Sequence, residues 1–461
     1  MILITFVDMR KRIVIACDSF KGCLGSGEVA SAVAEGIRRI MPDAEIIISE
    51  TADGGEGSGG ILTKSMGGET VTVSVKDPLG RLINAQYGII STDISSLKTE
   101  GKVTENTARE ATEESEGTTG KATGKATEKA TGKATGKATT AIIEMAQASG
   151  LTLLSKEERN PLLTSTYGTG EMILDAIGKG CRKFLIGIGG SATNDGGTGM
   201  LEALGFRFLD KNGKEIKGCC GGRLGEIADI YSKNVSQEIL DAEFIIACDV
   251  TTPFCGKEGA TNVFASQKGA DEKALESLEK GMHSFAAVIN QKYDINLNDI
   301  PGTGAAGGLG GAFKTFLKSE LKSGIDMILD AAGFDDIIEG ATLVITGEGK
   351  IDFQSSRGKV IDGIYRRCMT KNIPVLAIAG IVDDNTDNHC TSSTKILSTE
   401  TSSTEISSRN NSNPLLTIRA IGPRPQNESD LEYAMRPEVA RKNISDTIRR
   451  YLLESFQVMS N

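Results

Sequence analysis

The amino-acid sequence predicts an α/β protein in which a parallel-sheet domain is interrupted by an inserted α+β domain. Apolar strands alternate with helical patterns near the start of the chain, and the same alternation returns after residue 340. Between these segments, two strands joined by a short turn indicate antiparallel pairing. Strand–helix–strand units form parallel sheets, so the two outer segments are expected to share one sheet. The predicted domains are a discontinuous one, residues 9–70 plus 301–461, and an inserted one, residues 71–300.

The first segment contains a complete strand–helix–strand unit. Arg12–Cys17 is an apolar, β-branched run that ends in the loop DSFKG, and it is predicted to be a strand. Ser26 is expected to cap a helix whose apolar residues recur at helical spacing until Pro42. Glu45–Ile48 is the next predicted strand and leads into ADGGEG. Ligands of parallel sheets bind at the carboxyl ends of the strands, where both loops fall.

The inserted domain and the last segment follow from the same patterns. A hairpin is predicted because Thr70–Val75 and Ala85–Ile90 are joined through DPLGR. Two further strands, Lys183–Ile188 and Glu243–Cys248, and a helix over Asp271–Ile289 complete this domain. The last segment is expected to contain strand Leu343–Thr346, helix 355–370, strands Pro374–Ala379 and Leu415–Ala420, and helix over most of Asp430–Phe456.

Two polar stretches are predicted to lie outside the core. Residues 92–139 end in five tetrapeptides, GKAT-GKAT-EKAT-GKAT-GKAT, and are expected to be a disordered low-complexity insertion. Alanine follows each Gly-Lys and no strand or helix flanks the repeat, so it is not a phosphate-binding P-loop. Residues 384–413 are expected to form a polar surface insertion. We expect removal of residues 92–136 to leave activity intact.

Composition excludes several classes of function. The net charge is −10, aromatic residues make up 5% and tryptophan is absent, which argues against a nucleic-acid partner. Nine cysteines without a C-x-x-C pair indicate reduced thiols in a cytoplasmic protein, and the presence of only two histidines, neither in a motif, argues against a histidine-based site. No apolar stretch approaches the roughly 20 residues that span a bilayer. Residues 1–8 are interpreted as an extension upstream of a start at Met9.

Loops that combine glycine with an acid recur along the chain, most of them directly after a predicted strand. Glycines allow backbone N–H groups to face phosphate oxygens, while carboxylates hold Mg²⁺ through oxygen contacts. One such loop is ordinary turn chemistry, whereas several at strand ends indicate a phosphate and metal site. The loops are CDSFKG (17–22), ADGGEG (52–57), GGSATNDGG (189–197), ACDVTTPFCG (247–256), PGTGAAGGLGG (301–311) and TGEGKIDFQS (346–355).

The stretch GIGGSATNDGGTGM, Gly187–Met200, permits two interpretations. Its first half matches a dinucleotide-binding signature, with Asp210 about 20 residues on as the ribose acid. Three further glycines follow Ala192 and disfavour the helix which that signature requires, by about 1 kcal/mol each. Asp195 would also repel a pyrophosphate. The stretch is therefore interpreted as a phosphate and metal loop, with Asp195 as a plain Asx turn before a short helix left open as the structural alternative.

The loop PGTGAAGGLGG also contains a G-x-G-x-x-G pattern. A poor strand, NLNDI, precedes it, which excludes a dinucleotide fold, and a helical run Ala312–Leu321 follows. Phosphate binding over the N-terminus of that helix stays possible. The alternative is a flexible turn between domains.

Single charged residues near these loops have structural alternatives. Lys21 can reach a phosphate or carboxylate, with Asp18 beside it as base or metal ligand, but surface lysines are usually solvated. Asp249 and Glu348 can equally be helix or turn caps. Arg357 and Lys359 can clamp an anion or lie on a helix surface. The cysteines near the proposed site are interpreted as packing residues because none has a recognisable histidine partner: Cys17, Cys248 and Cys255.

Seven motifs, taken in order along the chain, resemble those of the bacterial glycerate kinases of type I. They are DSFKG, ADGGEG, NPLLTSTYGTGEMI, GIGGSATNDGG, ACDVTTPF, PGTGAAGGLGG and TGEGKIDFQSSRGKV. The resemblance covers about residues 11–90, 140–383 and 414–456. It implies a Rossmann-like domain interrupted by a second domain, with the active site in the cleft, and phosphorylation of D-glycerate by ATP with Mg²⁺, at the 2-hydroxyl. The departures Cys17 for proline and Cys23 for serine remove no charged group.

With this function, each candidate residue takes a predicted role in direct phosphoryl transfer. Asp195, or failing that Asp18, accepts the glycerate hydroxyl proton, and Lys21 assists. Asp53, Asp249 and Glu348 hold Mg²⁺. Substrate is bound by Ser19, Lys21, Arg357 and Lys359. The nucleotide or the transferred group is bound by Gly189, Gly190, Ser191, Asn194, Gly196, Gly197, Gly302, Gly304, Gly307 and Gly308.

Four alternatives to this assignment remain at this point. The product is 3-phosphoglycerate, or the substrate is another small hydroxy acid. A nicotinamide-dependent dehydrogenase is disfavoured because neither glycine loop has its strand and helix. A sensor that binds a sugar acid without turnover would not need so many acids beside glycine loops. The expected partner is the small-molecule substrate alone, for a monomer or a homodimer.

Overall fold

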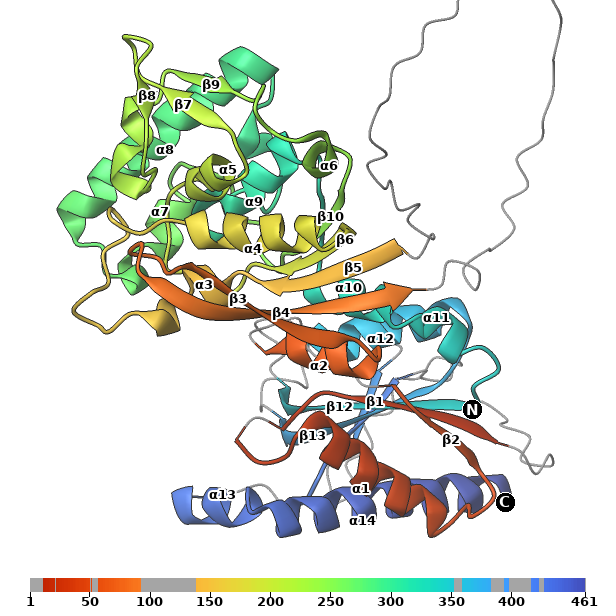
Figure 1. The fold of residues 1–461 in the computed structure, drawn as a ribbon. Coiled ribbons are helices and arrows are strands. Elements are labelled where there is room, and N and C mark those ends of the chain that lie inside the picture. Colours follow the sequence, from red (N-terminus) through yellow and green to blue (C-terminus); the bar gives the residue numbers. More distant parts are fainter. Residues whose placement is uncertain are drawn as a thin grey trace, which may run out of the picture.

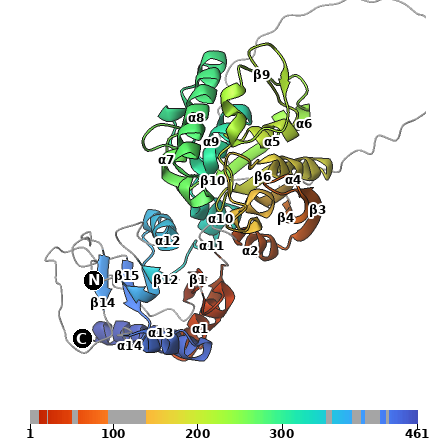
Figure 2. The same ribbon diagram turned by 90° about the vertical axis from the view of Figure 1, so that its left-hand side faces the viewer.

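The computed structural model describes nine segments of the chain: residues 11–20, 22–49, 51, 57–92, 138–351, 359–382, 394–397, 416–422 and 427–460. The molecule has two lobes, each built around one six-stranded sheet (Figure 1, Figure 2). The fold is a mixed α/β fold with parallel strands and covering helices, as the sequence predicts.

The first sheet is parallel throughout, with the strand order β14-β15-β13-β12-β1-β2. Its strands are β1 (Arg12–Cys17), β2 (Glu45–Ile48), β12 (Leu343–Ile351), β13 (Val375–Val382), β14 (Thr394–Leu397) and β15 (Leu416–Ala420). Helices α1 (Ser26–Arg38), α13 (Glu428–Ala434) and α14 (Pro437–Ser460) lie below it in Figure 1, and α10 (Gly324–Ala331), α11 (Phe334–Ile337) and α12 (Lys359–Thr370) lie above.

Alternation along β1 explains why both faces of this sheet are covered. Ile13 and Ile15 pack with α1 and α14, whereas Val14 and Ala16 pack with α10 and α12. All four side chains are at most 1% exposed. Parallel sheets with helices on both faces have such continuous apolar strands.

The second sheet has the order β11-β10-β6-β5-β4-β3 and is mixed. β3 (Glu69–Lys76) and β4 (Leu82–Thr92) form the predicted hairpin, β5 (Ala138–Glu144) is antiparallel to β4, and the rest is parallel: β6 (Cys181–Gly187), β10 (Glu243–Ala247) and β11 (Glu320–Lys322). A three-stranded sheet adds β7 (Arg207–Leu209), β8 (Glu215–Ile216) and β9 (Asp229–Tyr231).

Helices cover both faces of the second sheet. One face carries the largest hydrophobic core, to which α4, α5, α8 and α9 contribute. The other face packs against Leu62 of α2 (Ser58–Ser65) and Met327 and Ile328 of α10. The remaining helices of this lobe are α3 (Ala146–Ser149), α4 (Tyr167–Gly178), α5 (Thr198–Ala203), α6 (Gln237–Leu240), α7 (Ala260–Phe264), α8 (Glu272–Tyr293) and α9 (Ala305–Phe316).

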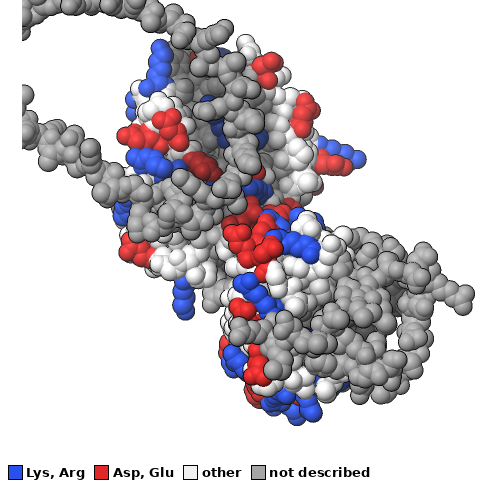
Figure 3. All heavy atoms as spheres, turned by 90° about the vertical axis from the view of Figure 1, so that its right-hand side faces the viewer, with Lys and Arg blue, Asp and Glu red and all other residues white. Residues whose placement is uncertain are grey.

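Helix α10 links the two lobes. Its Ile325 and Leu329 belong to the core of the first sheet, and its Met327 and Ile328 to that of the second. On the same helix, Asp326 and Asp330 bind Arg367 of α12, with nitrogen–oxygen distances of 3.4 and 2.6 Å. Figure 3 shows acidic and basic side chains side by side where the lobes meet.

Several predicted boundaries differ from the observed ones. Gly25, not Ser26, caps α1, since Ser26 is already helical. The helical run predicted to Leu321 ends at Phe316, and Leu321 lies in β11. β14 falls inside the stretch 384–413 that is predicted to be a surface insertion, and the ends of the insertion 92–139 belong to β4 and β5.

The points at which the chain passes from one sheet to the other differ from the predicted domain boundaries at residues 70 and 300. Helix α2 packs against the second sheet, and β3, which begins at Glu69, is one of its strands. The last strand of this sheet along the chain is β11, at 320–322. The chain leaves the first sheet after β2 and returns to it with β12. Which ranges fold as independent domains stays a prediction.

The ends of the low-complexity insertion are neighbours in the sheet, since Thr92 pairs with Ala138. Replacing residues 93–137 by Asn-Gly, which favours a tight hairpin turn, should therefore leave solubility and turnover unchanged. The measurement is the yield of soluble protein and kcat beside the full-length chain. A control deletion that also removes Thr139–Ala141 should abolish soluble protein, because these residues pair with β6. Equal behaviour of the two deletions would contradict this prediction.

Candidate functional site

Two acids follow the last paired residues of β1 and β12 in the first sheet. Cys17 of β1 pairs with Gly347 of β12, so Asp18, directly after β1, and Glu348 of β12 are next in register. The N–H of Asp18 donates to the Gly347 carbonyl at 2.9 Å, and its Oδ1 accepts from the N–H of Ser19 at 2.6 Å. Asp18 is 7% exposed. The structure thus brings together three of the predicted site residues.

Glu348 and Asp249 bind the N-termini of helices. Glu348 Oε1 accepts from the N–H groups of Val360 and Ile361 in α12, at 2.7 and 3.2 Å. Asp249, after β10, accepts from the N–H of Gly324 in α10 at 2.8 Å. Carboxylates stabilise helix N-termini through the free N–H groups and the helix dipole. The interpretation of both acids as helix caps is confirmed, and their role as Mg²⁺ ligands stays a prediction.

The predicted magnesium ligands do not form one cluster in the described part of the chain. Asp249 follows a strand of the second sheet, whereas Glu348 lies in the first sheet. No group of three or more His, Cys, Asp or Glu with metal-binding geometry occurs among the described residues. Asp53, Lys21 and Arg357 lie outside the described residues, and Lys359 is the first residue of α12.

The loop after β6 exposes two glycines at the carboxyl edge of the second sheet. Gly189 and Gly190 are exposed, and Gly190 adopts a left-handed φ of +72°. Two backbone hydrogen bonds fix this loop to the segment around residue 150. The N–H of Leu151 donates to the Gly190 carbonyl at 2.8 Å, and the N–H of Ala192 donates to the Ser149 carbonyl at 2.9 Å. A fixed loop with outward-facing backbone suits the binding of phosphate oxygens.

Asp195 has the environment of a structural carboxylate. Its side chain is fully buried, and its Oδ2 accepts from the N–H and the hydroxyl of Thr166, both at 2.8 Å, and from the N–H of Gly199 at 3.2 Å. Its Oδ1 accepts from the N–H of Gly197 at 3.1 Å. Burial raises the pKa of Asp195, and these donors oppose that shift. Asp195 holds the start of α5 against the Thr166 segment, as the structural alternative predicts.

Most of the other predicted phosphate glycines are packed against one another. Gly196 donates to the Gly307 carbonyl at 2.9 Å. A Cβ at Gly307 would lie 2.1 Å from the carbonyl oxygen of Thr193, and one at Gly197 would lie 2.4 Å from the Cβ of Ala312. The loops 189–197 and 301–311 are thus in contact, and the second is no flexible turn between domains. The buried members of the predicted set are Ser191, Asn194, Gly196, Gly197, Gly302, Gly304, Gly307 and Gly308.

The geometry also bears on the dinucleotide alternative. Helix α5, which follows the loop, has only six residues, as the additional glycines predict. Asp210, the proposed ribose acid, instead accepts from the N–H groups of Asn212 and Lys214 in the turn between β7 and β8. These backbone hydrogen bonds, the Lys214 bond foremost, lower the pKa of Asp210. Nothing in this arrangement places Asp210 on a nucleotide.

Two residues of the site were missed from the sequence. Glu144, at the end of β5, accepts from the N–H groups of Gly57 and Gly59 at 3.1 and 2.7 Å, and so ties the end of the ADGGEG loop to the second sheet. A small pocket lies there, lined by α2, Glu144, Gly187 and α10. Lys268 is buried beneath the loop after β6. Neither residue lies in a glycine-rich motif that would mark it.

One expectation about the cysteines was wrong. Cys255 has a histidine partner, because its Sγ lies 3.4 Å from Nδ1 of His283. The other ring nitrogen of His283 lies 3.1 Å from Glu279. Burial nevertheless raises the pKa of the Cys255 thiol, so this residue is not an activated nucleophile. Its interpretation as a packing residue agrees with its 3% exposure.

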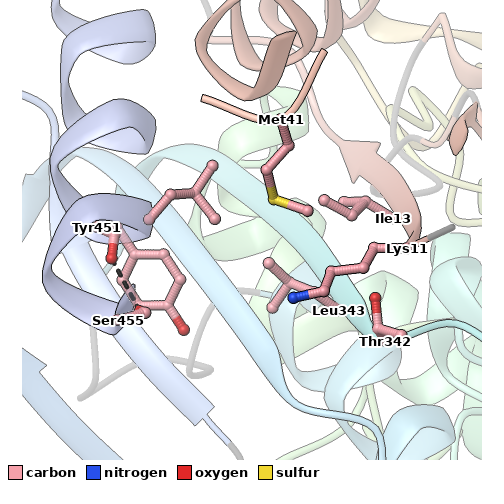
Figure 4. Close-up of a pocket in the computed structure, with 8 residues that line it drawn as sticks. Lys11, Ile13, Met41, Thr342, Leu343, Tyr451 and Ser455 are labelled. Atoms are coloured by element: carbon pink, nitrogen blue, oxygen red, sulfur yellow. Dashed lines mark hydrogen bonds between the residues drawn. The ribbon is translucent and has the colours of Figure 1, made fainter. Parts of the chain in front are cut away.

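A second pocket lies at the opposite edge of the first sheet and is separate from the candidate site. Figure 4 shows Lys11 and Ile13 of the β1 end and Thr342 and Leu343 of the β12 end facing Tyr451 of α14. These residues are at the amino ends of the strands, whereas Asp18 and Glu348 are at the carboxyl side. Burial lowers the pKa of Lys11 to about 8.

Two helix-covered sheets, with acids and an exposed glycine loop at the carboxyl ends of their strands, define an α/β protein with its candidate site on strand-end loops. Among the described residues, no helix has the length and apolarity needed to cross a membrane. The family model of the glycerate kinase family matches residues 13–100 and 99–420. The chain belongs to this family and is a kinase.

Individual relatives agree. The chain is 40% identical to a glycerate 2-kinase of Escherichia coli over 374 residues, 81% of this chain and 86% of the relative. It is 39% identical to a glycerate kinase of Halalkalibacterium halodurans over 368 residues, 80% and 85% of the two chains. The crystal structure of a proposed glycerate kinase 2 from Salmonella typhimurium LT2 superposes with a TM-score of 0.72, at 32% identity and over 97% of this chain and 99% of that one.

Proposed function

We propose that this enzyme transfers the γ-phosphoryl group of ATP to the 2-hydroxyl group of D-glycerate. The observation that supports the position of transfer is the 40% identity to a relative named glycerate 2-kinase. The 3-hydroxyl is the alternative acceptor. We further propose that the enzyme works in the cytoplasm as a monomer or homodimer, which fits the free thiols of all the described cysteines.

Asp18 is the group we propose to accept the proton of the substrate hydroxyl. In this step the hydroxyl oxygen bonds to the γ-phosphorus, the bond from that phosphorus to the bridging oxygen breaks, the proton passes to the Asp18 carboxylate and ADP leaves. Asp18 lies at a strand end beside Glu348, whereas Asp195 is fully buried with four hydrogen bonds to its carboxylate. We therefore propose Asp18, the second candidate base of the sequence analysis, in place of Asp195, the first.

We propose that the first part of the loop after β6 binds phosphate, where Gly189 and Gly190 are exposed and Ser191 is 9% exposed. The N–H groups of Gly189 and Gly190, with the Ser191 hydroxyl, would contact the nucleotide phosphates. Lys21, Ser19 and Arg357 are proposed to bind the glycerate carboxylate or the moving phosphoryl group, with Lys359 nearby in the chain. The buried glycines allow this loop to pack closely against the loop 301–311.

Mg²⁺ prefers oxygen ligands, so carboxylates at the strand ends are proposed to bind it, although Asp249 and Glu348 lie at different sheets and each caps a helix. Glu348, beside Asp18, together with Asp53 and Asp249 are the residues proposed to hold it. Bound Mg²⁺ would neutralise phosphate charge.

The test is ADP release over a panel of small hydroxy acids, with and without Mg²⁺. We expect release with ATP, Mg²⁺ and D-glycerate, and background rates with L-glycerate, lactate or without Mg²⁺. An excess of EDTA serves as the control for metal dependence. Equal rates with lactate would contradict the assignment of the substrate, and unchanged rates in EDTA would contradict that of the metal.

A further inference from the structure

The side chain of Lys268 is buried directly beneath the exposed loop after β6. Lys268 ends the short 3₁₀ turn Ser266–Lys268 and is 3% exposed. Its Nζ donates to the Ser191 hydroxyl and to the Thr193 carbonyl, both at 2.7 Å. One ammonium group thus holds two points of the loop that follows Gly190.

Burying this ammonium group is unfavourable for folding. No carboxylate of the described residues lies within ion-pair distance of Nζ, and Asp195, bound to other donors, acts on it only as a neighbouring charge. Burial lowers the pKa of Lys268 to about 7. Because a buried ammonium group without a carboxylate partner opposes folding, its retention beneath the exposed glycine loop indicates a function.

The hydrogen bond to Ser191 fixes the direction of the serine hydroxyl. An ammonium group can only donate, so the Ser191 oxygen accepts from Lys268 and its own proton is available to another acceptor. The N–H groups of Gly189 and Gly190, next in the chain, donate to no other described residue. The N–H groups of Gly189 and Gly190 and the hydroxyl of Ser191 are thus three consecutive donors close to one buried positive charge. This combination is typical of an anion-binding site.

We propose that Lys268 is a positioning residue of the nucleotide-phosphate site: it orients the Ser191 hydroxyl and fixes the loop so that Gly189, Gly190 and Ser191 bind the phosphates of ATP. This inference rests on the proposed function, because it takes ATP to be the phosphoryl donor. Lys268 does not contact the ligand and acts through Ser191 and the loop.

The test measures the dissociation constant of Mg·ATP by calorimetry in Lys268→Met, Ser191→Ala, the double variant and Lys273→Met. Lys273 is an exposed lysine nearby in the sequence and serves as the control. We expect Ser191→Ala to weaken ATP binding about tenfold and Lys268→Met at least about tenfold, because Lys268 also holds the loop at Thr193. The double variant should bind ATP no more weakly than Lys268→Met alone, and the control should bind normally. Additive losses in the double variant would overturn the route through Ser191.

The pH dependence adds a signature that a merely structural lysine lacks. The ammonium group is present below pH about 7 and lost above it, so the wild-type advantage over Lys268→Met should decline as pH rises through this value. Taking the ratio of the two proteins cancels the titration of ATP itself. A ratio that stays constant with pH would contradict the role of the charge.

The outcomes separate this inference from the proposed function. Wild-type protein that binds ATP but does not phosphorylate glycerate would refute the proposed substrate and leave Lys268 tested by the affinities. Unchanged ATP affinity in Lys268→Met or Ser191→Ala would overturn the role of Lys268. If Lys268→Met is not soluble, the ATP affinity of Ser191→Ala decides whether the proposal holds, because this variant removes only one hydroxyl.

Discussion

Asp18→Asn should lower kcat by about 10²- to 10⁴-fold, the range that a general base contributes. The amide keeps an oxygen that can accept from the Ser19 N–H, so this hydrogen bond should be retained. The measurement is kcat for glycerate at saturating ATP, together with the urea midpoint of unfolding. Asp43→Asn, in an exposed turn, is the matched control and should be normal in both. A kcat within threefold of wild type would exclude Asp18 as the base.

Asp195→Asn separates the two candidate bases, because it should act on stability first. An amide in place of the carboxylate puts an NH₂ group against donors and leaves buried N–H and hydroxyl groups of Thr166 or Gly199 without an acceptor. A lost acceptor of this kind costs about 1–3 kcal/mol, and more for a charged one. A variant with normal unfolding but abolished kcat would return the base assignment to Asp195.

The second large effect concerns the contact of the two glycine loops. Gly307→Ala should lower the free energy of unfolding by about 3 kcal/mol, of which about 1 comes from the left-handed φ and the rest from steric overlap. Gly307 has φ +66°, and its Cβ would lie 2.1 Å from a backbone oxygen of Thr193, which cannot move without the loop. The measurement is urea unfolding monitored by circular dichroism.

Gly213→Ala is the control for this effect. Gly213 has a similar φ of +77° but nothing within 4 Å of its Cβ, so only the cost of about 1 kcal/mol for the backbone should appear. Equal destabilisation by the two substitutions would contradict the close contact between the loops 189–197 and 301–311.

The strands that sequence patterns predict well are apolar runs that end at a clear loop, whether they are buried like β1 or partly exposed like β2. Arg12–Cys17 and Glu45–Ile48 are observed with their predicted bounds, because both are apolar and end in glycine-bearing or polar loops. β5 was not predicted, since its sequence ATTAIIE continues directly from the GKAT repeats. β14, with the sequence TKIL, is surrounded by polar residues. Such short strands are defined by their partners in the sheet rather than by local composition.

The site was predicted as a set of loops more successfully than as a set of roles. Glycine content correctly marked the loops that meet, but could not distinguish a glycine that faces solvent, such as Gly190, from one that permits close packing, such as Gly307. Asp195 and Lys268 illustrate the same limit. Both owe their character to burial and to partners far away in the sequence, Thr166 and Ser191, which no local pattern contains.

Phosphorus NMR of the product tests the proposed reaction most directly. Wild-type protein, ATP, Mg²⁺ and D-glycerate should yield a single new phosphomonoester resonance that coincides with added 2-phosphoglycerate, in step with the loss of the γ-phosphate signal of ATP. A resonance that coincides with 3-phosphoglycerate would contradict transfer to the 2-hydroxyl, and inorganic phosphate alone would contradict transfer to glycerate.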